Sequence, residues 1–510
     1  MSWIHPLSGE APPELIGGKA HGLIVLRCLG LSVPPGFVVG TAAGRAFHRY
    51  GRLPDGLGDE LAAAVAELET ATGRRLGGPE RPLVVSVRSG AAVSMPGMMA
   101  TILNLGLTAA ATDGLARETG DRAFADDARR RFLAGFEEAT AGQGAPDDAY
   151  RQLELAVAAV FASWDAPRAR RYRELHDIPH DLGTAVVVQA MVFGNRDEHS
   201  AAGVAFSRDP TTGEPVPFGE VLFGHQGDDV VSGRSLTRPL RDLSGREPAA
   251  GAALVEALNR LERHYRDASY VEFTVECGRL WLLQARPGRF AGPAAVRVAT
   301  DLVDEGLIGR DEALLRVSPR HLAAAVRRID TADLLARRTG ASPGVAVGRV
   351  ATSSEAAVRM AAHGPVILVR PETSPLDLPG LAAAVGVLTA RGGPASHAAI
   401  VARSMGRPAV VGVADLTVDN GRMYLGGRSI EDGTVITIDG TGGEVALGAV
   451  ATVSVANDER RERLLAWADE VVDEVADELA GPGEQRSDPD RLRAAQDVLR
   501  NASGDRFERP

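Results

Sequence analysis

The sequence predicts a multidomain protein of mixed α/β class. At 510 residues the chain has room for two to four domains of ordinary size, and 45% hydrophobic with 24% charged residues is the balance of a globular protein. In two separate stretches, short β-branched runs bounded by Gly and Pro occur beside apolar helical patterns. Other stretches, rich in Ala, Arg and Glu with apolar residues three to four apart, are typical of surface helices.

We place the first domain at residues 1–290. Its opening part alternates helical stretches with short strands such as LVVSV at 83–87. Residues from about 108 to 180 have helical spacing and predict a helical insert. Strand signals return from 183 to 286 and end in YVEFTVECGRLWLLQAR, where Cys277 and Gly278 are expected to form a hairpin turn. We expect these strands to rejoin the opening part in one composite domain.

The remaining sequence predicts a second domain between linkers. Residues 291–341 carry an Ala, Arg and Leu pattern that predicts a helical linker. Residues 342–450 are rich in Val, Gly and Ala and predict a compact unit of strands around one clear helix, HAAIVARSMG. The final stretch, 451–510, is expected to be a charged linker helix followed by a weakly packed polar tail.

Composition argues against several classes of protein. A formal net charge of −11 disfavours a nucleic-acid-binding surface, which requires a basic face. No apolar run approaches the roughly 18 residues of a membrane span, and the N-terminus lacks the layout of a signal peptide, so we expect a cytoplasmic protein with no membrane partner. The two cysteines, Cys28 and Cys277, form no CxxC pair and are expected to be core residues rather than disulfide partners.

The most informative segment is TARGGPASHAAIVARSMGRPAVVG at 389–412. An apolar strand leads through a glycine turn into a helix that is expected to begin near His397 and end near Gly406. A helix N-terminus favours an anion and disfavours a charged ring, which suits a neutral imidazole that accepts a phosphoryl group. In the alternative interpretation, His397 only caps a helix or packs in a turn.

Other residues of this segment are candidates to hold the phosphoryl group. Glycines let the backbone approach a phosphate closely, arginines offset its charge, and a serine before the helix is expected to cap it. These candidates are Gly392, Gly393, Ser396, Thr389, Arg391 and Arg403.

The segment resembles the phosphohistidine loop of the pyruvate phosphate dikinase, phosphoenolpyruvate synthase and phosphotransferase-system enzyme I group, with His397 at the phosphorylated position. Four further segments resemble pyruvate phosphate dikinase in the same order along the chain: LIGGKAHGLIVLRCLGLSVPPGFVV, VVSVRSGAAVSMPGMMATILNLGL, VVVQAMVFGNRDEHSAAGVAFSRDPTTGE and YVEFTVECGRLWLLQARPGR. The resemblance implies an ATP-grasp nucleotide-binding domain with the helical insert, followed by a swivelling phosphohistidine domain of β/β/α type.

The resemblance also assigns residues to ATP. A Gly-Gly-Lys turn before an apolar helix suits phosphate contact, although alone it is more often only a helix start. The resemblance makes Lys19 an ATP ligand and gives Arg88 a contact with the transferring phosphates. As an isolated segment, the small-residue loop after Arg88 could equally be a packed turn.

A second group of ATP-site candidates lies in the expected hairpin. Glu272, Gln284 and Arg286 alternate with apolar neighbours and should share one face of the hairpin. A carboxylate and an arginine on such a face can simply be a surface ion pair. The resemblance instead implies that Glu272 holds Mg²⁺ and that Gln284 and Arg286 line the nucleotide site. Weaker candidates for the same cleft are Glu220, Gln226 and Asp228.

The sequence departs from the family pattern at three points. Tyr270 stands where the motif ordinarily has an Asp, which removes a metal or ribose ligand. Ala395 replaces a hydroxyl residue two positions before His397. No segment resembles the (β/α)₈ barrel in which the family binds pyruvate or phosphoenolpyruvate, so we expect the phosphoryl acceptor to be bound outside this chain.

The resemblance therefore implies a two-stage phosphotransferase. ATP with Mg²⁺ binds, the γ-phosphoryl passes to inorganic phosphate or water, the β-phosphoryl passes to His397, and AMP leaves. The second stage delivers the phosphoryl group to a separate barrel subunit carrying pyruvate or to a small hydroxyl compound. The other hypothesis, which the departures motivate, is a non-catalytic protein that binds nucleotide or a partner dikinase.

Overall fold

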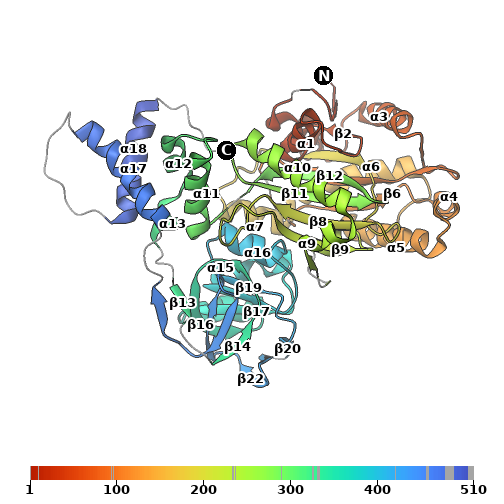
Figure 1. Ribbon diagram of the computed structural model, residues 1–510. Coiled ribbons are helices and arrows are strands. Elements are labelled where there is room, and N and C mark those ends of the chain that lie inside the picture. Colours follow the sequence, from red (N-terminus) through yellow and green to blue (C-terminus); the bar gives the residue numbers. More distant parts are fainter. Residues whose placement is uncertain are drawn as a thin grey trace.

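The computed structural model describes residues 2–503 apart from residues 10, 94, 96, 232–234, 236, 289, 324–326, 330–332, 420, 455–458 and 477–486. It contains helices and several sheets, which confirms the mixed α/β class (Figure 1). We name three parts: the large lobe (residues 2–288), the small lobe (333–451) and the helical unit formed by 292–323 and 459–503. Among the described residues, no helix combines the length and apolar composition needed to cross a bilayer.

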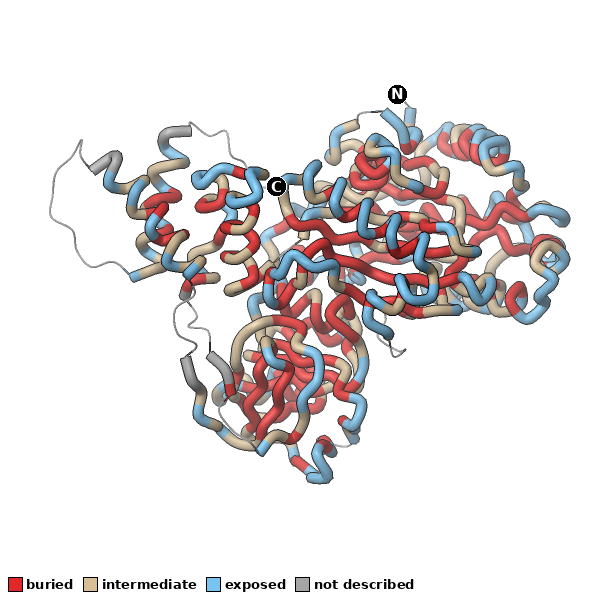
Figure 2. Tube along the Cα trace, in the orientation of Figure 1, coloured by how far each residue is buried: buried red, intermediate tan, exposed pale blue. Residues whose placement is uncertain are grey.

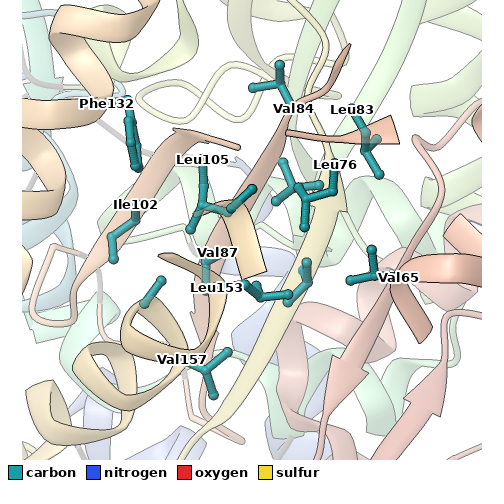
Figure 3. Packing of buried hydrophobic residues seen from close by; sticks show 14 of the residues in the cluster. Val65, Leu76, Leu83, Val84, Val87, Ile102, Leu105, Phe132, Leu153 and Val157 are labelled. Carbon is teal, nitrogen blue, oxygen red and sulfur yellow. The ribbon is translucent and has the colours of Figure 1, made fainter. Parts of the chain in front are cut away.

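The first sheet of the large lobe has the strand order β1-β2-β7-β5-β6. The strands are β1 (Ile4–Pro6), β2 (Gly36–Val39), β5 (Val85–Gly90), β6 (Thr101–Leu105) and β7 (Ala185–Ala190). Because side chains alternate between the faces of a strand, one face packs on α6 (Ala149–Ala162) and its neighbours. Figure 3 shows this core, in which Val87 and Ile102 lie beside Leu153 and Val157.

The expected insert is helical. It contains α4 (Ala109–Thr119), α5 (Arg122–Ala139), α6 and α7 (Pro167–Leu175). Three of these helices start where a short polar side chain accepts a first-turn amide, at Thr108, Asp121 and Asp148. These caps satisfy first-turn amides and so fix where the three helices begin.

The second sheet of the large lobe has the order β10-β9-β8-β11-β12. Its strands are β8 (Ala201–Phe206), β9 (Phe218–Phe223), β10 (Arg238–Pro239), β11 (Ser269–Glu276) and β12 (Arg279–Pro287). One face packs on α1 (Pro13–Cys28) and α10 (Pro248–Tyr265). Cys277 and Gly278, with φ of 50° and 76°, form the hairpin turn and confirm that prediction. Cys28 and Cys277 are exposed at the end of a helix and in a turn, so the expectation of core cysteines was wrong.

The small lobe is built on an eight-stranded sheet of order β14-β24-β23-β16-β17-β18-β19-β15. Its strands are β14 (Leu334–Arg337), β15 (Thr339–Ser342), β16 (Val345–Ala351), β17 (Val366–Arg370), β18 (Gly386–Thr389), β19 (Ala409–Val411), β23 (Val435–Asp439) and β24 (Glu444–Leu447). Alternate residues of β17 serve opposite faces: Val366 and Leu368 face α14 (Ser354–Ala361), α15 (Leu378–Ala383) and α16 (His397–Ser404).

The other face of this sheet packs on a small three-stranded sheet. Ile367 and Val369 of β17 contribute to this second cluster. The three strands are β20 (Thr417–Asp419), β21 (Arg422–Leu425) and β22 (Arg428–Glu431). Figure 2 shows the buried trace through the main sheet, with exposed segments around it.

The helical unit corrects two predictions. The helices are α11 (Gly292–Asp304), α12 (Arg310–Arg316), α13 (Pro319–Ala323), α17 (Glu459–Ala476) and α18 (Asp488–Ser503). Residues 291–341 were expected to form a helical linker, but this range also contains the strands β13 (Arg327–Ile329), β14 and β15. These residues form strands because each pairs with a strand that is distant in the sequence. The expected polar tail includes α18, which buries Leu492 and Ala495 against the other helices.

Two short strands join the helical unit to the small lobe. β13 leaves the helical unit, and β25 (Thr452–Ser454) returns to it. They pair antiparallel, with Ile329 opposite Thr452. The helical unit itself is tied to the large lobe by Arg208, which is buried and bonds Glu305 of the unit at 2.6 Å. The two-stranded ribbon is therefore the connection through which the small lobe is attached.

Candidate functional site

The helix that carries His397 lies at the contact between the two lobes. Figure 1 shows α16 and α15 at the edge of the small lobe that faces α7 of the large lobe. Ala398 and Ala399 of α16 belong to one buried cluster with Met98 and Trp164 of the large lobe. The small lobe is thus docked, with the face that carries α16 packed against the large lobe.

His397 is held as a neutral base at this contact. It is the first residue of α16, after β18 and a turn in which Gly392 has a φ of 90°. Its Nδ1 lies 3.1 Å from Thr373 Oγ1, and its Nε2 is enclosed without a hydrogen-bond partner among the described residues. Burial lowers the pKa of His397 to about 4, against a smaller opposing effect of Asp377. A neutral imidazole with one free nitrogen is suited to nucleophilic attack.

Thr373 is a site residue that sequence reasoning missed. It follows β17 and precedes a short turn in which Ser374 and Asp377 form a capping box. In the tautomer that carries the ring proton on Nδ1, this N–H donates a hydrogen bond to Thr373 Oγ1, and the nitrogen lone pair available for attack lies on Nε2. The Ser-Pro-x-Asp pattern predicts the turn, but nothing in it indicates the histidine 24 residues away.

The expected cap by Ser396 is corrected. Ser396 is at the N-cap position, but its hydroxyl makes no cap hydrogen bond and is buried without a partner among the described residues. The residue is only 4% exposed. The first-turn amides of α16 are therefore left without the serine oxygen that usually satisfies them.

The other loop candidates are spread over different environments. Thr389 is fully buried and donates to Arg391 O at 2.8 Å, so it braces the loop. Arg391 itself is exposed and pairs with Glu372 at 2.8 Å rather than with the histidine ring. Arg403 is buried and donates to the carbonyls of Pro394 and Ala399, so it holds the loop from inside. Burial lowers the pKa of Arg403 to about 10.

Lys19 and Arg88 form the cationic part of the large-lobe site. Gly17 has a φ of 79° and interrupts α1 two residues before Lys19. A Cβ at Gly17 would lie 1.5 Å from Gly90 O, so only glycine lets the turn lie this close to the end of β5. Burial, followed by the neighbouring Arg88, lowers the pKa of Lys19 to about 8, and Glu272 acts in the opposite direction.

Arg88 is fixed before any ligand binds. Its guanidinium donates to Gln189 Oε1 at 2.6 Å and to Leu283 O at 3.1 Å, and its Nε is buried without a partner among the described residues. Burial lowers the pKa of Arg88, while Glu272 raises it. Lys19, Arg88 and Glu272 therefore interact electrostatically at one place.

The hairpin places its candidates on one face, as predicted. Glu272 is directly opposite Gln284, and Tyr270 is opposite Arg286. Glu272 and Arg286 are not opposite each other in this register, and among the described residues no ion pair joins them. Arg286 instead stacks on the Tyr270 ring, 4.4 Å from its centroid.

Tyr270 and Ala395, two departures from the family pattern, belong to one buried cluster. They lie in it with Phe206 and Leu222 of the large lobe. The Tyr270 ring is 5.0 Å from that of Phe206, and its hydroxyl is 3.5 Å from Glu272 Oε1. Burial raises the pKa of the phenol far above its ordinary value, so it stays protonated. Tyr270 therefore packs between the lobes.

The protein supplies few ligands for a metal. No group of three His, Cys, Asp or Glu residues suited to a metal occurs in the part of the chain that is described. The Glu272 carboxylate and the Gln284 amide face each other across the hairpin, which gives oxygen donors from two residues. That is compatible with Mg²⁺, which is commonly held by one or two carboxylates together with substrate phosphates and water.

Comparison with known proteins gives two family matches. Residues 51–237 match the model described as pyruvate phosphate dikinase, AMP/ATP-binding domain. Residues 362–443, which include His397, match the PEP-utilising enzyme mobile domain. The first match covers the Arg88 segment and the second the histidine loop.

Curated relatives match most of this chain. It is 41% identical to pyruvate, phosphate dikinase 1, chloroplastic, of Arabidopsis thaliana, over 90% of this chain and 53% of the relative. It is 40% identical to pyruvate, phosphate dikinase of Rhizobium meliloti (strain 1021) and 38% identical to that of Clostridium symbiosum, over 89% of this chain and 58% and 59% of the relatives. The chain thus spans little more than half the length of these relatives. It belongs to the pyruvate phosphate dikinase family of PEP-utilising enzymes.

Proposed function

We propose that this chain takes the β-phosphoryl group of ATP onto His397 and passes it to an acceptor bound elsewhere. In the first stage, the γ-phosphoryl goes to inorganic phosphate or water. The bond between the α- and β-phosphates breaks, Nε2 of His397 bonds to the β-phosphorus, and AMP leaves. The observation that carries the proposal is the Nε2 of a neutral imidazole at a helix N-terminus, which is enclosed in the contact between the lobes and has no hydrogen-bond partner among the described residues.

The large lobe is proposed to act as an ATP-grasp domain. Lys19 and Arg88 would neutralise the phosphates and Arg286 would add charge at the edge of the site. Glu272 and Gln284 would hold Mg²⁺, which offsets the charge that develops on the phosphoryl oxygens. The mutual electrostatic effects of Lys19, Arg88 and Glu272 support this assignment.

The small lobe is proposed to swivel between two positions. In-line attack requires Nε2 within about 3 to 3.5 Å of the phosphorus, and delivery to an outside acceptor requires the histidine to leave the large lobe. The ribbon of β13 and β25 is the natural hinge because only these two paired strands join the small lobe to the helical unit along the chain. The acceptor would be a separate protein carrying pyruvate, as the family name indicates, or a small hydroxyl compound.

The proposal is tested with ATP labelled in the β-phosphate, supplied with Mg²⁺ and inorganic phosphate. We expect acid-labile, base-stable label on the protein, as for a phosphoramidate. The variant His397→Asn should take up none while still binding nucleotide. Label that persists in His397→Asn, or no label on the unaltered chain, would refute the assignment.

Tyr270 supports a second candidate function, a nucleotide-binding regulator without turnover. The phenol at this position is protonated and stacked, so it contributes no charge to a metal site. On this view the chain binds ATP but transfers nothing. Tight nucleotide binding, measured by calorimetry, together with the absence of label on His397 would favour it over the phosphotransferase.

A further inference from the structure

We propose that Glu220 is a latch for the histidine loop: its carboxylate holds Gly393 and Ala395 against the large lobe and must let go before the loop can leave. Glu220 is thereby a positioning residue, and its role as a step in the cycle rests on the proposed function. The docking that it controls is measurable without phosphoryl transfer.

The latch is a direct contact between the lobes. Glu220 is in β9 of the large lobe, and its Oε2 accepts the Ala395 amide of the small lobe at 3.1 Å. Its Oε1 accepts the hydroxyl of Thr237, which comes from its own lobe. One carboxylate oxygen is therefore bound within the large lobe, while the other binds the histidine loop of the small lobe.

Gly393 is shaped to receive this carboxylate. A Cβ at Gly393 would lie 1.5 Å from Glu220 Oε1 and 2.1 Å from its Cδ, far inside any permitted contact. The φ of Gly393 is not in the left-handed region, so the backbone alone would accept alanine. The glycine is required by the seated carboxylate rather than by a turn, which points to a built contact.

The carboxylate is buried in the docked arrangement, and the balance of its interactions there makes the latch reversible. Glu220 is only 6% exposed, and burial raises its pKa, while Thr237, the Ala395 amide and Arg403 act in the opposite direction. Hydrogen bonds from its donors stabilise the buried carboxylate, whereas the loss of its hydration destabilises it. These two contributions to the free energy largely offset each other. When the loop leaves, water can replace the Ala395 amide. Such a contact specifies a position without making it permanent.

Glu220 also faces the same side of the sheet as the proposed metal site. It pairs with Val204, which pairs with Glu272, which pairs with Gln284, so these four residues form one row across the strands. Residues in one row point to the same face, and strands are about 4.8 Å apart, which puts Glu220 about 10 Å from Glu272. The latch therefore holds the histidine loop over the face that carries the proposed nucleotide ligands.

The test is hydrogen exchange of the loop amides in the full chain without nucleotide, with small-angle scattering as a measure of opening. Glu220→Ala leaves the Ala395 amide without its acceptor and should speed exchange of residues 393–399 at least tenfold. Glu220→Gln keeps an acceptor oxygen and the shape, so its exchange should stay within about threefold of the unaltered chain. Gly393→Ala should open the loop as Glu220→Ala does.

The double variant Glu220→Ala with Gly393→Ala separates the latch from general damage. The new methyl group then occupies the space that the carboxylate vacated, so exchange should be slower than in Gly393→Ala alone. Controls are Glu256→Ala, an exposed glutamate on α10, and Gly245→Ala, where a Cβ meets nothing within 4 Å. Unchanged exchange in Glu220→Ala, or no rescue in the double variant, overturns the latch.

The latch and the proposed function fail separately. Faster loop exchange in Glu220→Ala, in a chain that takes no label from ATP, would sustain the latch and refute the phosphotransferase. Normal labelling of His397 together with unchanged loop exchange in Glu220→Ala would support the phosphotransferase and refute the latch.

Discussion

Acidification provides the most direct test of how His397 is held. Burial lowers its pKa from 6.5 to about 4 in the docked arrangement. At pH 5.5 the docked imidazole should be about 97% neutral, whereas an exposed one would be about 9% neutral. Because the docked pKa lies below the unfolded value, the docked state binds fewer protons and loses stability as the pH falls from 6.5 toward 4. The difference between a pKa of 6.5 and one of about 4 corresponds to roughly 3 kcal/mol of stability of the docked state, which is fully lost below pH 4.

The assay is a nuclear magnetic resonance titration of a chain with ¹³C-labelled histidine rings, with the His397 signal assigned by its absence in His397→Asn. We expect this signal to titrate well below pH 6 while an exposed histidine titrates near 6.5. Scattering at each pH reports whether the lobes separate in the same range. A midpoint at or above 6.3 in a chain that remains docked would refute the argument that burial keeps the ring neutral.

Three further predictions concern other contacts. Thr373→Val removes the oxygen that faces His397 Nδ1 and should slow label uptake from ATP about fivefold, which is the effect of losing roughly 1 kcal/mol. The control Thr417→Val, on the exposed edge of the small lobe, should leave the rate unchanged. Equal rates in the two variants would contradict the role of the Thr373 hydroxyl. Gly17→Ala should weaken ATP binding in calorimetry at least tenfold because its Cβ meets a carbonyl, whereas Gly30→Ala, at a similar φ in open space, should cost only about 1 kcal/mol of stability. Arg208→Ala leaves two carboxylates without their cation and should lower the free energy of unfolding in urea by about 3 kcal/mol; a loss below 1 kcal/mol would show that this ion pair does not tie the helical unit to the large lobe.

Features with local signals were predictable from the sequence. The hairpin could be placed because Cys277 and Gly278 interrupt two alternating runs, and α16 because a glycine turn precedes its apolar spacing. The shared face of Glu272, Gln284 and Arg286 followed from the period of a strand. In each case neighbouring residues alone determine the local geometry.

Features that depend on distant partners were not predictable. Residues 334–342 form strands because β24 and β19 pair with them. The sequence predicts a polar tail where α18 lies, because its few apolar residues, among them Leu492 and Ala495, are buried only when other helices pack on them. Thr373 could not be predicted as a site residue because His397, its hydrogen-bond partner, lies on another element.

The way the small lobe is attached has a consequence for protein engineering. The chain enters at Ile329 and comes back at Thr452, and these two residues are directly paired, so their Cα atoms are about 5 Å apart. In topological terms the small lobe is an insertion into the rest of the chain, and its two ends lie next to each other. A bridge of two or three residues would span that gap, so the remaining chain could be closed without stretching either neighbouring helix.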